Sequence, residues 1–417
     1  MSLRIAFVLN PLTLRRTGGE HAPFLARELL GKGHAVRVFG DVAGDIPQSG
    51  LEEEPGESMA PLERHGLRGF EPDVIIAYDG HSPAAWFAAR AARELRVPLV
   101  LVEAGFPPHG KPVERFFRSI GRALWGGLVR RTVSRVVALD QAAARQAKER
   151  GFRADLVLVQ PSGVDGGVFR PGLASDVLTR NGVRGRVLLH MGRVEPGRGI
   201  EVLIHAFART LGRLDDWSLV FCGNGSFRPG ARAVAERLGI GAHVHWTAIN
   251  LDAELPGLLA SSTALLVPVL DDDVASLKIR RAMACGVPVL ASDVARLSGL
   301  VEEDVTGLVV EAGDLEAWQV AISRLAADPS RRLRWGESAL RHAERHLVWP
   351  KVASRFEELL EELVAATVGA GPRAADREAG TPGDSPDAGA QELVFDPAAR
   401  GAGALNGSVL ASRSESA

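Results

Sequence analysis

The sequence has 417 residues, of which 46% are hydrophobic and 24% charged, and a formal net charge of −2. The composition is typical of a globular protein and the length predicts two domains, while the near-neutral charge does not indicate nucleic-acid binding. No apolar run reaches the roughly 20 residues of a membrane-spanning helix, and the N-terminus lacks a signal-peptide pattern. Cys222 and Cys285 form no disulfide or metal motif. We expect a cytoplasmic protein, at most peripheral at a membrane.

Short apolar runs alternate with amphipathic stretches through the first part of the chain. The pattern predicts strands at 4–10, 35–40, 72–79, 98–105 and 135–140, and helices at 19–34 and 82–95. Continuous β-branched runs separated by helices are typical of a parallel sheet covered on both faces. The glycine- and proline-rich stretch 160–172 has no such periodicity and is predicted to connect two domains.

The same alternation resumes after this connection. Strands are predicted at 186–193, 217–225, 243–248, 264–270, 288–293 and 307–313. The fold class is therefore α/β, with two Rossmann-like parallel-sheet domains facing a central cleft at the carboxyl ends of their strands. The predicted boundaries are 1–165, 166–346, a helix at 347–366 that packs back toward the N-terminal domain, and a disordered tail at 367–417 that is poor in large apolar residues.

Two glycine-containing loops are candidate anion sites. Gly18 and Gly19 precede a predicted helix, whose free N–H groups and partial positive charge attract anions. Arg193 follows a predicted strand and Arg198 precedes the next helix, where two guanidinium groups can grip a diphosphate. The simpler interpretations are an ordinary loop for the glycines and solvated surface positions for the arginines.

Two further turns lie at predicted strand ends. Gly223 and Asn224 end one strand, so a flat ligand can lie close to the backbone, although a plain turn also fits. Ser276 and Leu277 begin a predicted helix and present free N–H groups. The aspartates at 271–273 precede that helix, and their carboxylates either accept hydrogen bonds from sugar hydroxyls or cap the helix.

Together these motifs resemble family 4 of the glycosyltransferases, a retaining family with the GT-B fold of two Rossmann-like domains. The resemblance is carried, in order, by "TGGEH…LARELLGKGHAVRV", "RVVALDQAAARQAKERGF…VLVQPSGVDGGVFRP", "GRVEPGRGIEVLIHAF" and "RAMACGVPVLASDV…GLVVEAGD". It implies transfer of a sugar from a nucleotide diphosphate sugar to an acceptor hydroxyl with retention of configuration. The N-terminal domain would bind the acceptor, and no cofactor or metal is expected.

The resemblance also implies the residues that bind the donor. Arg193 matches the family's phosphate arginine, and Arg198 stands where the family usually has lysine. The donor-binding set would be Gly18, Gly19, Arg193, Arg198, Gly223, Asn224, Ser276, Leu277 and Arg281.

The chain departs from the family pattern at the donor helix. Two glutamates normally stand eight positions apart there, whereas this chain has Asp273 and Arg281. The second glutamate normally accepts hydrogen bonds from ribose hydroxyls, and arginine has no acceptor. Arg281 then either donates to hydroxyl oxygens, pairs with an acidic neighbour or an extra phosphate, or marks a contact that has been lost.

The N-terminal domain departs from the pattern as well. Many members carry a histidine after the strand that matches 98–105, and this chain has Glu103 or Ala104 there. The catalytic candidates are therefore Glu103, Asp273 and His81, with His109 as a further loop histidine. A loop histidine is also compatible with a purely structural role.

A basic, aromatic-rich segment at 111–135 resembles an amphipathic helix that touches anionic lipid, or an outer helix packed on the sheet. The acceptor has no readable motif, and three classes of acceptor stay open: a glycan, a lipid-linked molecule and a small molecule. Two other functions stay open: a non-catalytic GT-B relative that acts as a partner or regulatory subunit, and a sugar-nucleotide epimerase on the same fold.

Overall fold

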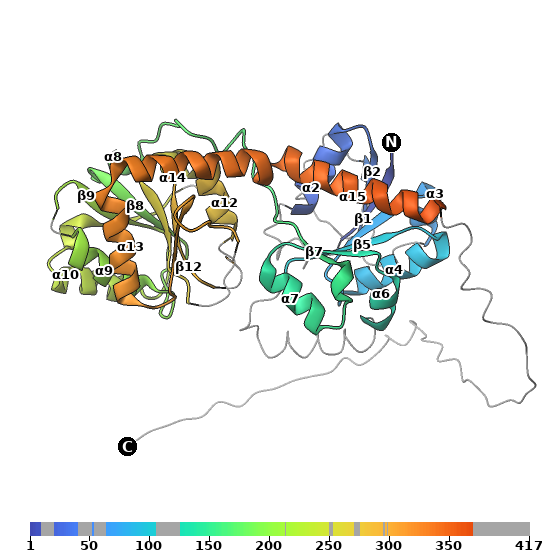
Figure 1. The fold of residues 1–417 in the computed structure, drawn as a ribbon, viewed down its shortest axis with the longest axis horizontal. Coiled ribbons are helices and arrows are strands. Elements are labelled where there is room, and N and C mark those ends of the chain that lie inside the picture. The colour runs from blue at the N-terminus through green and yellow to red at the C-terminus, as the bar shows by residue number, and fades with distance from the viewer. Residues whose placement is uncertain are drawn as a thin grey trace, which may run out of the picture. The chain divides into compact units, whose positions relative to one another are not determined.

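A computed structural model describes residues 1–9, 21–40, 52–53, 64–105, 126–212, 214–249, 253–270, 276–294, 297 and 299–369 (Figure 1). Several predicted features lie outside these residues, namely Gly18, Gly19, Asp273, His109, most of segment 111–135 and the tail beyond residue 369. The described residues contain two parallel sheets with helices against both faces of each.

The N-terminal sheet has seven strands in the order β3-β2-β1-β4-β5-β6-β7, and every neighbouring pair is parallel. Its strands are β1 (Arg4–Val8), β2 (Ala35–Phe39), β3 (Glu52–Glu53), β4 (Val74–Tyr78), β5 (Leu99–Glu103), β6 (Arg135–Ala138) and β7 (Val157–Val159). Its helices are α2 (His21–Gly31), α3 (Arg64–Phe70), α4 (Pro83–Leu95), α6 (Gly126–Thr132), α7 (Gln141–Glu149) and the 3-10 turn η1 (Ala154–Leu156).

Alternate residues of the central strands enter two different cores. Ile5 and Phe7 of β1 belong to the core that contains α2, whereas Ala6 and Val8 belong to the core that contains α4. A strand covered on both faces has no solvent side, which is why these segments are continuously apolar rather than alternating.

The C-terminal sheet has six strands in the order β10-β9-β8-β11-β12-β13, again all parallel. Its strands are β8 (Arg186–Met191), β9 (Trp217–Cys222), β10 (Val244–Thr247), β11 (Ala264–Val267), β12 (Val289–Ser292) and β13 (Gly307–Val310). Its helices are α8 (Val177–Arg180), α9 (Ile200–Thr210), α10 (Arg228–Arg237), the 3-10 helix η2 (Gly241–His243), α11 (Leu255–Ala260), α12 (Ser276–Ala284), α13 (Leu315–Ala327), α14 (Pro329–His342) and the π-helix η3 (Ala343–Leu347).

The two faces of the C-terminal sheet bury different helices. Helices α9, α10 and α13 share one core with alternate strand residues such as Leu188 and Phe221, and α11, α12 and η3 share the other with Leu189 and Val220. Both sheets therefore present the carboxyl ends of several parallel strands at one edge, where loops are free to carry binding groups.

Helix α15 (Trp349–Gly369) follows the C-terminal sheet in sequence but packs in the N-terminal core, beside α2 (Figure 1). Phe356, Leu360 and Val364 are buried among residues of β1 and β4. The Trp349 ring stacks on Phe24 with centroids 5.4 Å apart. The chain thus returns to the N-terminal unit and completes its hydrophobic core. Among the described helices, the 21-residue α15 included, none has the length and apolar character needed to cross a membrane.

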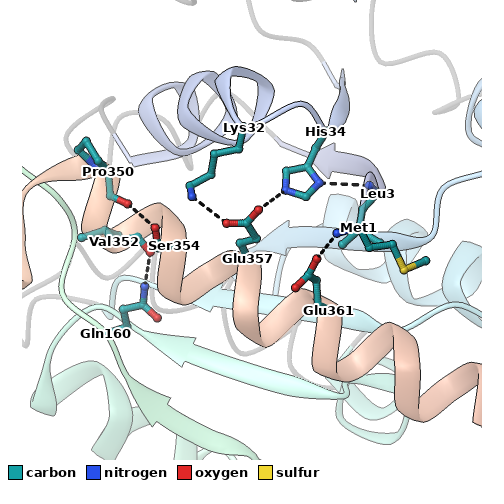
Figure 2. Close-up of polar contacts among 10 residues, drawn as sticks. All are labelled: Met1, Leu3, Lys32, His34, Gln160, Pro350, Val352, Ser354, Glu357 and Glu361. Atoms are coloured by element: carbon teal, nitrogen blue, oxygen red, sulfur yellow. Dashed lines mark hydrogen bonds and ion pairs between the residues drawn. The ribbon is translucent and has the colours of Figure 1, made fainter.

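Polar contacts fix the register of α15 on the N-terminal unit (Figure 2). The Glu357 carboxylate accepts hydrogen bonds from Lys32 Nζ at 2.8 Å and from His34 Nε2 at 3.0 Å. The backbone N–H of Leu3 donates to His34 Nδ1 at 3.1 Å, which leaves Nε2 of the neutral ring as the donor to Glu357. One carboxylate therefore ties α15 to the segment after α2.

Replacing Glu357 with glutamine is expected to reduce the free energy of unfolding by about 1 kcal/mol at neutral pH. Hydrogen bonds from Lys32 and His34 lower the pKa of Glu357 below its usual value of 4.5. The charged carboxylate consequently contributes stability above pH 4.5, and this contribution is lost as the pH falls through the lower folded value. The free energies of unfolding of the wild type and E357Q, measured with urea, should therefore become equal in acid. The exposed residue Glu358 provides the control variant E358Q. Equal free energies of unfolding for E357Q and E358Q at neutral pH would contradict the stabilising role of Glu357.

Candidate functional site

A cavity of about 510 Å³ lies in the C-terminal unit, where β8 and β9 end and α12 begins. Its walls are formed by Met191, Gly192, Arg193, Cys222, Gly223, Asn224, Ala248, Ile249, Leu255, Leu277, Lys278 and Arg281. The cavity therefore combines five residues predicted to bind the donor: Arg193, Gly223, Asn224, Leu277 and Arg281. Ser276 and Arg198, also predicted, are not among the wall residues.

The turns after β8 and β9 touch each other through their backbones. The N–H of Gly192 donates to Cys222 O at 3.0 Å, and the N–H of Val194 donates to Asn224 O at 3.0 Å. Gly223 has φ +147°, and a Cβ added there would lie 2.1 Å from Gly192 O. Gly223 is thus required by the contact between the turns, which places Arg193 and Asn224 on the same wall.

The two loop arginines lie in different surroundings. Arg193 is on the cavity wall with its side chain 72% exposed, and its Nη2 donates to Glu195 Oε1. Arg198 is half-buried directly before Gly199, which has φ +71° and caps α9. A Cβ at Gly199 would lie 1.9 Å from Pro268 O, so close backbone packing accounts for that glycine.

Helix α12 presents one side to the cavity and the other to the core. Leu277, Lys278 and Arg281 line the cavity, whereas Ile279 and Ala282 are fully buried. The Arg281 guanidinium carbon lies 4.8 Å from the centroid of the Phe169 ring, within the range of a cation–π contact. Phe169 therefore holds the arginine that stands at the family's second glutamate position.

Lys278 and its neighbour His190 were not among the predicted site residues. The Nζ of Lys278 donates to Met191 O, the last carbonyl of β8, at 2.6 Å. The His190 Nδ1 lies 3.2 Å from Leu266 O, so Nδ1 carries the proton that is donated to this carbonyl. Burial, and next the charge of Lys278, lower the pKa of His190 to about 3, which leaves the ring neutral. Lys278 could have been found from its spacing, since it lies three positions before Arg281 on the same helical face.

The described cavity wall is chemically divided. Arg193, Lys278 and Arg281 give it three cations, and no described wall residue is acidic. Ala248, Ile249 and Leu255 form an apolar part near the end of β10. Burial raises the pKa of the Cys222 thiol to about 11, so this wall residue is not a thiolate nucleophile. Such a wall suits a ligand with an anionic group and a flat, less polar group.

The other catalytic candidates lie at the carboxyl edge of the N-terminal sheet. Glu103 ends β5 and is 1% exposed, with its Oε1 accepting the Gly80 N–H at 2.9 Å and its Oε2 3.5 Å from Arg150 Nη1. His81 is buried just before α4, two residues after Asp79, a non-glycine residue at φ +56°. Left-handed backbone at a strand end is a feature of functional loops. Asp79 and Arg150 carried no signal in the sequence because their roles depend on their neighbours in space.

Within the described ranges, no group of three or more His, Cys, Asp and Glu side chains is placed to hold a metal ion. The expectation of a reaction without a metal cofactor stays a prediction.

Family comparisons agree with this architecture. A model of the glycosyl transferase 4-like domain matches residues 18–163, and a model of glycosyl transferases group 1 matches residues 180–342. The chain belongs to glycosyltransferase family 4. The predicted family is thus confirmed, and its two domain models match the two parts of this chain that contain the sheets.

Curated relatives resemble this chain over different lengths. The D-inositol 3-phosphate glycosyltransferase of Segniliparus rotundus is 31% identical over 193 residues, which are 45% of this chain and 43% of the relative. The enzyme of the same name from Xylanimonas cellulosilytica is 29% identical over 353 residues, 76% of this chain and 80% of the relative. The first match thus spans less than half of the relative's length, and the second spans most of it.

Solved structures show the same fold. HepE of Anabaena, crystallised in complex with UDP, aligns with a TM-score of 0.66 at 21% identity over 87% of this chain and 100% of HepE. A glycosyltransferase from Rickettsia africae aligns with a TM-score of 0.67 at 16% identity over 86% of this chain and 98% of that chain. The predicted GT-B fold is confirmed.

Gly223→Ala is expected to lower the free energy of unfolding by more than about 1 kcal/mol, because the new methyl collides with Gly192 O at a left-handed position. Gly69→Ala in α3 is the control, since a Cβ there meets no atom within 4 Å. Chemical denaturation should show a clearly lower free energy of unfolding for G223A and no decrease for G69A. Wild-type stability of G223A would contradict the backbone contact.

Proposed function

We propose that this glycosyltransferase moves a sugar from a nucleotide diphosphate sugar to an acceptor hydroxyl, with retention of configuration. The observation that carries the proposal is the divided cavity wall, with Arg193, Lys278 and Arg281 in one part and Ala248 and Ile249 in another. A nucleotide diphosphate has the matching division, because its phosphates are anionic and its base is flat and weakly polar. HepE, which shares the fold, was crystallised with UDP and with UDP-glucose, and this supports the choice of donor class.

The chemistry requires loss of a diphosphate from an oxocarbenium-like carbon. Negative charge then develops on the leaving phosphate, and fixed donors that already face this oxygen stabilise it without further reorganisation. Arg193 has an exposed guanidinium that is bound only to Glu195 among its described contacts, so a phosphate can compete for it. Arg281 is held by Phe169, so part of its ordering entropy has already been lost before the donor binds.

The acceptor is proposed to bind at the carboxyl edge of the N-terminal sheet. Glu103 is held there by the Gly80 N–H and faces Arg150, an arrangement that suits a fixed hydrogen-bond acceptor better than a freely turning base. His81 lies at the same edge, after the left-handed Asp79. Relatives named D-inositol 3-phosphate glycosyltransferase make a phosphorylated polyol the first acceptor to test.

Turnover separates this function from its alternatives. The protein is incubated with UDP-, GDP- and ADP-sugars, with and without D-inositol 3-phosphate, and products are followed by NMR. Transfer with an unchanged anomeric configuration supports the proposal, and an inverted product contradicts retention. Binding without turnover supports the regulatory relative, whereas a changed sugar that is still attached to its nucleotide supports the epimerase.

Peripheral membrane contact through 111–135 is a separate proposal. The described end of this segment is α6, whose last turn carries Arg130 and Arg131. Flotation with vesicles that contain anionic lipid should recover the protein, and recovery that does not depend on anionic lipid would contradict an electrostatic contact.

Arg281→Glu is expected to weaken binding of the preferred nucleoside diphosphate by at least about tenfold, since one charge-assisted interaction is replaced by repulsion. Calorimetric titration of R281E and of R281Q measures the loss, and R281Q should lie between R281E and the wild type. Tighter binding by R281E would show that the arginine is a decayed remnant of the family's glutamate position.

Removing divalent metals is expected to leave turnover unchanged, because the cavity wall already provides cations for the departing diphosphate. Initial rates are compared after dialysis against EDTA and after re-addition of Mg²⁺ or Mn²⁺. A rate that disappears with EDTA and returns with the metal would contradict the prediction.

A further inference from the structure

Arg130 of α6 extends toward the start of its own helix and toward His81. A Cβ added to Gly126 would lie 2.9 Å from Arg130 Nη1 and 3.6 Å from His81 Nδ1. A Cβ added to Gly151, the second residue after α7, would lie 3.5 Å from Arg130 Cδ and 3.7 Å from its Nε. Helical side chains ordinarily lean toward the N-terminus of their helix, as this one does. The guanidinium therefore occupies space between two glycines, beside the catalytic candidate His81.

Space, rather than backbone conformation, accounts for the glycine at position 126. Gly126 is buried and is not one of the glycines with a positive φ. A methyl group there would approach Arg130 Nη1 more closely than van der Waals contact allows and would force the guanidinium to move. The first residue of α6 thus leaves room for this cation.

The positive charge of Arg130 has no counter-charge within the described part of the chain. No hydrogen bond or ion pair joins its guanidinium to any residue that the structure describes, although Arg130 is half-buried. Partial burial makes an unpaired charge costly, which is why such groups are usually hydrogen-bonded. None of the Arg130 nitrogens is enclosed, so a ligand can reach them from solvent.

The neighbouring charged groups are already engaged. The Glu103 carboxylate accepts the Gly80 N–H at 2.9 Å and lies 3.5 Å from Arg150 Nη1. Asp79 Oδ1 accepts the backbone N–H of the residue two positions later at 3.4 Å. Arg130 differs from these groups because its donors are unused within the described residues.

We infer that Arg130 binds a phosphate group carried by the acceptor and thereby holds the acceptor's hydroxyls near His81 and Glu103. The inference rests on the proposed function and names the acceptor class, a polyol that bears a phosphate ester. A guanidinium has five N–H donors and forms paired hydrogen bonds with two oxygens of a phosphate. A polyol phosphate therefore brings an anion to this cation and keeps its hydroxyls available for transfer, whereas a neutral glycan supplies no counter-charge.

Four variants of the full-length protein test this assignment. Arg130→Met removes the charge and the donors, and Arg130→Lys keeps the charge but loses the paired hydrogen-bonding geometry. Gly126→Ala keeps the guanidinium but adds a methyl group against its Nη1. Arg145→Met removes an exposed arginine of α7 and is the control.

Calorimetry measures the binding of D-inositol 3-phosphate, of glycerophosphoinositol, which is the headgroup of a phospholipid, and of myo-inositol. At least one of the two phosphate esters should bind the wild type more tightly than myo-inositol, and the tighter ester distinguishes a soluble acceptor from a lipid headgroup. For that ester R130M should lose about 10- to 100-fold in affinity, the effect of a charge-assisted hydrogen bond. R130K and G126A should lose less and R145M nothing, while affinity for nucleoside diphosphates stays the same in all the variants.

Four results would overturn the inference. The wild type binds neither ester more tightly than myo-inositol; R130M keeps the wild-type affinity; R145M loses as much as R130M; or R130M loses nucleoside diphosphates by the same factor. The third result would indicate a general effect of positive charge, and the fourth a damaged fold. The proposed function fails on a different measurement, namely the absence of turnover with every nucleotide sugar, which leaves these ester affinities unaffected.

Discussion

The site depends on the close approach of two backbone turns at the carboxyl edge of the C-terminal sheet. The turn after β9 reaches the turn after β8 only because Gly223 has no side chain to meet Gly192 O. This contact sets Arg193 and Asn224 on one wall and brings Gly192 beside Lys278. A parallel sheet makes the arrangement possible, since the carboxyl ends of its neighbouring strands lie at one edge.

The N-terminal unit is built on the same plan but is completed by a distant part of the chain. Helix α15 supplies Trp349 and Phe356 to the core of the first sheet, and Glu357 fastens it to Lys32 and His34. The chain therefore leaves the first unit, forms the second, and returns to the first. The edge that carries Glu103 and His81 rests on a core whose stability depends on Trp349, Phe356 and Glu357, which lie far later in the sequence.

The periodicity of the sequence was sufficient to predict both sheets, because strands buried on both faces leave continuous apolar runs such as Val74–Tyr78. The resemblance to the family's motifs, rather than the periodicity, placed Arg193, Gly223 and Arg281 at one site. The sequence did not reveal why glycine is needed at positions 199 and 223. A Cβ at Gly199 would collide with Pro268 O, and one at Gly223 would collide with Gly192 O. Such contacts between loops leave no local sequence pattern. The family motif points only to the backbone N–H groups at the start of α12, so it did not predict that the Lys278 side chain lines the cavity, although Lys278 lies three positions before Arg281. Domain boundaries and catalytic roles stay predictions.

The most direct test of the account is a crystal structure of the protein with its preferred nucleoside diphosphate. The account predicts that the phosphates lie within hydrogen-bonding distance of Arg193 and Arg281, with the base toward Ala248 and Ile249. Phosphates bound away from these two arginines, or a base in the cationic part of the cavity, would contradict it.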